Sequence, residues 1–181
     1  MQERKIYNPI QKDYVTFLEM SHETDDKHTL LEVDLAPNGG VGLHYHHHYT
    51  ESFEVIEGVL GLQIGKKILH LKVGETASAN IHEKHRFFND TQTYCKFRCI
   101  VKPAFRGFEE VLQIGYGLVR DGKTNAKGLP KNRLVLAYLV WLGEVHLTGW
   151  RAWMEPFINQ MAKKAIQKGL DKVLREQYVK F

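Results

Sequence analysis

The sequence predicts a mainly β domain followed by an α-helical extension. Three observations support this. Apolar and polar residues alternate with a period of two in the first 102 residues, and apolar residues recur at helical spacing after Pro103. The net charge also changes, from −2 in residues 1–102 to +6 in residues 103–181. We therefore expect two domains, 1–103 and 104–181.

Short strands account for the first domain. Alternating or short apolar segments occupy residues 31–35, 53–57, 60–64, 68–73 and 95–101. Turn-forming residues separate them, as at 37–40 and at Gly65-Lys66, which is typical of a hairpin. Short strands with regularly spaced turns favour a β-sandwich or a β-barrel.

About three helices account for the second domain. Helical spacing of apolar residues predicts them at residues 105–121, 134–142 and 156–178, with a break at 148–151. The last helix has one apolar face, and lysines and an arginine cover the rest of its surface. This pattern favours a helix that packs on the barrel or on a second subunit. The alternative is peripheral contact with a membrane surface.

Composition excludes several classes of protein. A net charge of +4 in 181 residues is too low for a dedicated nucleic-acid binder. The longest apolar run, 134–142, is far shorter than the roughly 20 residues of a membrane span. Residues 1–10 contain no apolar signal segment. Cys95 and Cys99 would lie about 13 Å apart on one strand, too far for a disulfide, so we expect a reduced, cytoplasmic protein.

Histidines are concentrated in one part of the first domain. Six of the ten lie within 42 residues, at His44, His46, His47, His48, His82 and His85. In an extended chain His44 and His46 point to the same side. Glu51 follows after enough chain for a bend, and His85 from another strand is the candidate fourth ligand.

The spacing of these residues resembles the two motifs of the cupin superfamily. Residues 39–46 supply Gly and His-x-His, and after four residues come Glu51, six residues and Gly58, as in the first motif. Gly74, His85 and Asn89 match the second motif at its spacings. Two positions depart from that motif. Asn80 replaces its proline, and His82 replaces its glycine.

The resemblance covers about residues 29–102 and implies a jelly-roll β-barrel with ligands at its mouth. By position, His44, His46, Glu51 and His85 resemble the three-histidine, one-carboxylate ligands of one divalent metal, which could be Fe, Mn, Zn or Ni. The alternative is a cupin that keeps these residues without using a metal.

Three further residues are candidates for the site. His82 could be a general base or a donor to a metal ligand, and His48 could line the barrel mouth in a catalytic role. Gln63 is a polar strand residue that could contact substrate. The alternative for His82 is a turn-filling surface role, and His48 is not needed to complete the four ligands.

The resemblance implies a metal-dependent enzyme acting on a small organic molecule, either an oxygenase or a Lewis-acid isomerase, lyase or cyclase. The alternative is a non-catalytic sensor of a metal or small ligand whose helical half engages a partner. We expect a homodimer, because the apolar faces of the predicted helices must be buried somewhere.

Overall fold

The computed structural model describes residues 4–146 and 153–181. The chain divides into two compact units, Met1–Phe105 and Arg106–Phe181. The division falls two residues after the expected boundary because Phe105 packs within the first unit, where its ring lies 5.5 Å from that of Tyr49.

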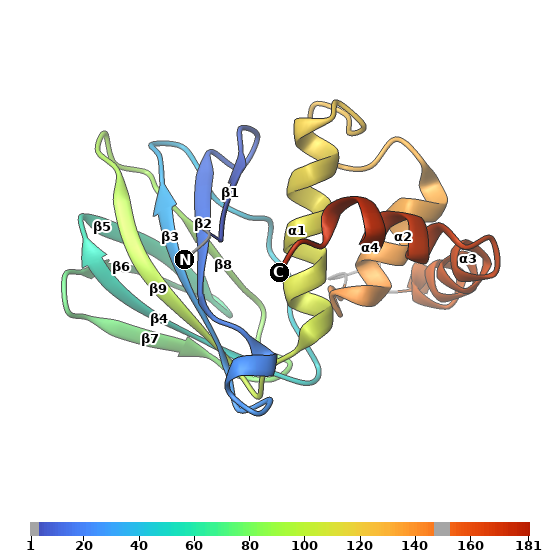
Figure 1. Ribbon diagram of the computed structural model, residues 1–181. Coiled ribbons are helices and arrows are strands. Elements are labelled where there is room, and N and C mark those ends of the chain that lie inside the picture. Colours follow the sequence, from blue (N-terminus) through green and yellow to red (C-terminus); the bar gives the residue numbers. More distant parts are fainter. Residues whose placement is uncertain (1–3, 147–152) are drawn as a thin grey trace. The chain divides into compact units, whose positions relative to one another are not determined.

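The first unit consists of two β-sheets (Figure 1). The strands of its described residues are β1 (Lys5–Asn8), β2 (Asp13–Glu19), β3 (Thr29–Leu35), β4 (Thr50–Glu57), β5 (Val59–Ile64), β6 (Lys67–Lys72), β7 (Thr76–Ala79), β8 (His85–Phe88) and β9 (Cys95–Lys102). Their order is β1-β2-β3-β9-β4-β7 in one sheet and β6-β5-β8 in the other. Neighbouring strands are antiparallel.

The core of this unit lies between the two sheets. Phe87 of the smaller sheet contacts Phe53 and Phe97 of the larger one, with ring centroids 6.3 and 5.1 Å apart. The alternating burial of β3 and β9 follows the period of two in the sequence, so their apolar residues face inward. Cys95 and Cys99 belong to this buried face and are not joined by a disulfide.

The second unit is helical. Its described residues form α1 (Arg106–Arg120), α2 (Arg133–Leu142), α3 (Glu155–Gln167) and α4 (Leu170–Tyr178). Its core is built from Ile114, Tyr138, Ala165 and Leu174, one from each helix. The prediction of a mainly β fold with a helical C-terminal part is confirmed.

One prediction for the helical unit is corrected by the structure, and another falls outside the described residues. The single helix predicted at 156–178 is two helices, because Gly169 adopts a left-handed conformation with φ of 71° between α3 and α4. The break expected at 148–151 lies outside the described residues. Within the described residues, every helix is too short or too polar to cross a membrane.

Candidate metal centre

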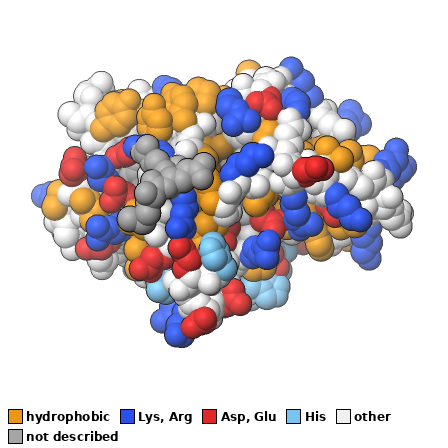
Figure 2. Space-filling view, viewed as in Figure 1, with side chains coloured by type: hydrophobic (Ala, Val, Ile, Leu, Met, Phe, Trp, Pro, Cys, Tyr) orange, Lys and Arg blue, Asp and Glu red, His pale blue; other side chains and the backbone are white. Residues whose placement is uncertain are grey.

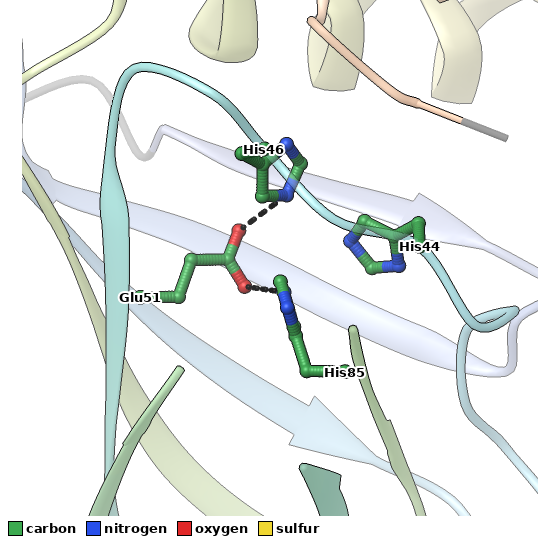
Figure 3. A group of neighbouring side chains, drawn as sticks. All are labelled: His44, His46, Glu51 and His85. Atoms are coloured by element: carbon green, nitrogen blue, oxygen red, sulfur yellow. Dashed lines mark hydrogen bonds and ion pairs between the residues drawn. The ribbon is translucent and has the colours of Figure 1, made fainter. Parts of the chain in front are cut away.

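The side chains of His44, His46, Glu51 and His85 converge in the first unit (Figure 3). One potential ligand atom from each lies within 4.8 Å of those of the other three. His46, Glu51 and His85 are buried, whereas His44 is partly exposed. The group is therefore enclosed around three of its residues and least covered at His44.

Three segments of the barrel bring these residues together. Glu51 is on β4, and His85 is the first residue of β8. His44 and His46 precede β4 in a segment that forms only an isolated bridge, whereas extended strand was expected there. In that bridge the His44 amide donates to the His85 carbonyl at 3.1 Å, and the His85 amide donates back at 2.8 Å.

Backbone carbonyls orient two of the imidazoles. Nδ1 of His44 lies 2.7 Å from the Gly42 carbonyl oxygen, and Nδ1 of His85 lies 2.8 Å from that of Glu83. A carbonyl oxygen only accepts hydrogen bonds, so each Nδ1 carries the proton. In the neutral ring Nε2 then has the lone pair, which is the arrangement found in metal-binding histidines.

Burial and mutual contact shift the pKa values of the group. Burial is the main cause that lowers the pKa of His44 to about 4, against the attraction of Glu51, so this imidazole is neutral at neutral pH. Burial by itself would raise the pKa of Glu51, but contacts with His46 and His85 outweigh it and hold that pKa well below its usual range. Burial by itself would lower the pKa of His85, but the hydrogen bond and the attraction of Glu51 outweigh it, so this pKa is raised.

The contact between His85 and Glu51 requires a positive charge. Nε2 of His85 is 3.2 Å from Oε2 of Glu51, and Nε2 of His46 is 3.4 Å from Oε1. With Nδ1 of His85 protonated, a neutral ring would bring a lone pair against the carboxylate. Either a second proton on His85 or a metal cation removes that repulsion. Ligand atoms bonded to one metal at about 2.1 Å have comparable separations, so the residues fit a metal.

Tyr49 supports the group and was not predicted from the sequence. Its ring is buried and stacks on that of His46, with centroids 4.2 Å apart and planes 25° apart. Phe105 packs against Tyr49 in turn, with ring centroids 5.5 Å apart. The sequence feature that could have identified Tyr49 is its spacing of two from Glu51. In an extended chain this spacing places both side chains on the same side.

The structure places the other three candidates in different surroundings. Gln63 accepts a hydrogen bond from Arg86 at 2.8 Å and donates to the Gly65 carbonyl at 3.2 Å. His48 is exposed, and its ring lies 6.5 Å from that of Phe105. His82 is exposed and lies beside His47. Catalytic or substrate-binding roles for Gln63, His48 and His82 stay predictions.

Residues 31–101 match the family model described as the cupin domain. This segment of the chain is a cupin domain. Many solved structures share this fold, and two of them serve as examples. One is a predicted oxalate decarboxylase from Thermotoga maritima, with 19% identity, a TM-score of 0.50, and coverage of 56% of this chain and 93% of that one.

The other structure is an RmlC-like cupin from Shewanella frigidimarina, with 16% identity, a TM-score of 0.51, and coverage of 59% of this chain and 89% of that one. Identities this low show the fold alone. No curated protein sequence matches this chain.

Proposed function

We propose that this cupin binds one divalent transition metal through His44, His46, Glu51 and His85 and is a metal-dependent enzyme acting on a small organic molecule. One observation carries the proposal. A buried carboxylate lies between two imidazole nitrogens at 3.2 and 3.4 Å, in a group of four donors within 4.8 Å. Nitrogen and oxygen donors in this ratio suit Fe, Mn, Zn or Ni.

A metal held by four protein ligands supplies Lewis-acid or redox chemistry at its remaining positions. The protein residues define where a substrate can approach. His46, Glu51 and His85 are buried, so the partly exposed side at His44 is the route for a small molecule. An oxygenase reaction or a Lewis-acid isomerase, lyase or cyclase reaction is compatible with this arrangement.

Metal analysis of the untagged protein, prepared in air and without oxygen, tests the proposal. We expect close to one equivalent of metal in the wild type. We expect His46→Ala and Glu51→Gln to lose it, because the first removes an imidazole donor and the second replaces the charged carboxylate with a neutral amide. His22→Ala is the matched control, because His22 is an exposed histidine outside the group.

The outcomes separate the alternatives. Iron that oxidises in air would support an oxygenase, and zinc, nickel or manganese unchanged by air would support Lewis-acid chemistry. A full equivalent of metal in His46→Ala would contradict the ligand assignment. A wild type that binds no metal after reconstitution would overturn the proposal and leave a cupin that kept these residues without using a metal.

A sensor that engages a partner through its helical unit is the second candidate. This unit has its own core yet exposes large apolar side chains, at Trp141, Trp153 and Phe157. On the face drawn in Figure 2, lysine and arginine side chains are interspersed with such apolar ones over the helical unit. Sedimentation of the metal-free and metal-loaded protein distinguishes the candidates. A metal-dependent change in self-association supports the sensor, and a dimer unchanged by metal supports the enzyme.

A further inference from the structure

A second pair of histidine rings lies in the cupin unit, outside the four-residue group. The ring centroids of His47 and His82 are 4.6 Å apart, and their planes are inclined at 59°. The rings of His44 and His85 in the buried group have nearly the same relation, at 4.6 Å and 52°. The pair therefore has the ring separation and tilt found among the candidate ligands of the buried centre.

Backbone hydrogen bonds hold the two histidines of this pair together. The His82 amide donates to the His46 carbonyl at 2.8 Å, so the turn at His82 is joined to the chain beside His47. The turn is closed by the Glu83 amide, which donates to the Asn80 carbonyl at 2.9 Å. The Glu83 carboxylate accepts from the Asn80 amide at 3.1 Å. The backbone positions from which the two rings extend are thus set by the fold before any ligand arrives.

The backbone of His82 is in a conformation that favours glycine. Its φ is 66°, in the left-handed region where a side chain carries an energetic cost. His82 also stands where the cupin motif has glycine. Backbone conformation therefore favours glycine over histidine at this position and does not explain the histidine. The position of its imidazole beside His47 offers an explanation.

We propose that His47 and His82 form a second, solvent-facing metal site that takes Zn²⁺, Ni²⁺ or Cu²⁺ independently of the buried centre. Imidazole is a preferred ligand of these three ions. Exposure of His82 allows water to complete the coordination. Two protein ligands bind more weakly than four, so this site fills after the buried one and exchanges its ion more readily.

Zn²⁺ titration of the metal-free, untagged full chain by calorimetry tests this site. We expect a tight and a weak binding event in the wild type. His82→Gly removes one imidazole while its backbone keeps the left-handed conformation, and we expect it to lose only the weak event. His47→Ala should do the same. His48→Ala and His22→Ala are the controls, and each should keep both events.

A weak event that persists unchanged in both His82→Gly and His47→Ala would overturn this site, as would a wild type without a weak event. Loss of the tight event in His46→Ala tests the buried centre separately. The proposals can therefore fail independently. A thermal unfolding curve for each variant, which we expect to stay within a few degrees of the wild type, distinguishes a lost ligand from a lost fold.

Discussion

Single residues that are not ligands orient the ligands of the candidate centre. The carbonyls of Gly42 and Glu83 hold two imidazoles with Nδ1 protonated, and the Tyr49 ring stacks on His46. Groups that orient metal ligands commonly affect metal affinity by about 10- to 100-fold. Metal binding by this protein should therefore respond to substitutions outside the ligand set.

Tyr49 allows this to be tested. Tyr49→Leu keeps an apolar side chain but removes the stacked ring, so His46 loses its orientation and we expect metal affinity to fall about tenfold. Tyr49→Phe keeps the ring and should bind metal within a fewfold of the wild type. Competition with a chromophoric chelator measures both. Equal affinities in the Leu and Phe variants would show that the stacking has no part in binding.

An ion pair outside the centre predicts a pH-dependent contribution to stability. The two terminal guanidinium nitrogens of Arg4, Nη1 and Nη2, donate to the Glu23 carboxylate, at 2.6 and 2.7 Å, and the Met20 backbone amide donates to it at 3.0 Å. The Arg4 contact is the main cause that lowers the pKa of Glu23 from 4.5 to about 2. A lowered carboxyl pKa stabilises the fold above pH 4.5, and this stabilisation is lost as the pH falls toward 2.

Arg4→Ala should therefore lower the free energy of unfolding at pH 7 by about 1 kcal/mol, a modest value because the pair is partly exposed. The difference from the wild type should shrink between pH 5 and pH 2. Urea denaturation across this range measures it. Lys27→Ala is the control, because the Lys27–Asp25 pair is far more exposed, and it should show little difference at any pH. A pH-independent effect of Arg4→Ala would contradict the assignment.

Within one helix, α1, two glycines meet different surroundings. A β-carbon added at Gly117 would lie 2.2 Å from the ring of Tyr178 on α4, whereas one added at Gly115 would meet nothing within 4 Å. Tyr178 cannot easily move away, because its hydroxyl donates to Asp121 and accepts from Lys123, both at 2.8 Å. Gly117 is therefore required for α1 and α4 to pack closely.

Alanine at these two positions should have opposite effects. Gly115→Ala should stabilise the protein by about 0.5–1 kcal/mol, because alanine loses less backbone entropy in a helix. Gly117→Ala should destabilise it by about 1–3 kcal/mol, because Tyr178 is displaced. Chemical denaturation followed by helical circular dichroism measures both. Destabilisation of similar size at Gly115 would show that its surroundings are more crowded than the described residues indicate.

Across the whole chain, the residues that form the candidate centre all belong to the first of two compact units. The ligands lie between residues 44 and 85, and Phe105, the last residue of that unit, packs against Tyr49. The helical unit supplies none of the four ligands. Metal binding should therefore be a property of the first unit by itself.

Two truncated chains test this independence. A fragment of residues 1–105 should bind metal with nearly the affinity of the full chain. A fragment of residues 1–103 lacks Phe105, so Tyr49 loses its support and we expect weaker binding. Calorimetry on both fragments and on the full chain makes the comparison. A folded 1–105 fragment without metal affinity would show that the helical unit contributes to the centre.

Local patterns in the sequence are sufficient to predict the general architecture. The period of two in β3 and β9 and the helical spacing in α1 and α2 arise from burial of one face, which leaves a regular trace along the chain. The strands β1, β2 and β7 were not predicted, and β8 was expected only as the strand that carries His85. Four residues, as in β1 and β7, are too few to show a period. The positions of His44, His46, Glu51 and His85 were expected from their spacing in the cupin motifs.

Other features depend on contacts between segments far apart in the sequence. The stacking of Tyr49 on Phe105, the pairing of His47 with His82, and the contact of Gly117 with Tyr178 leave no periodic signal. Each results from how separate strands or helices pack. The residue types available to the site could thus be identified from the order of amino acids. Which side chains support one another was decided by close packing in three dimensions, since that is where their distances and orientations are set.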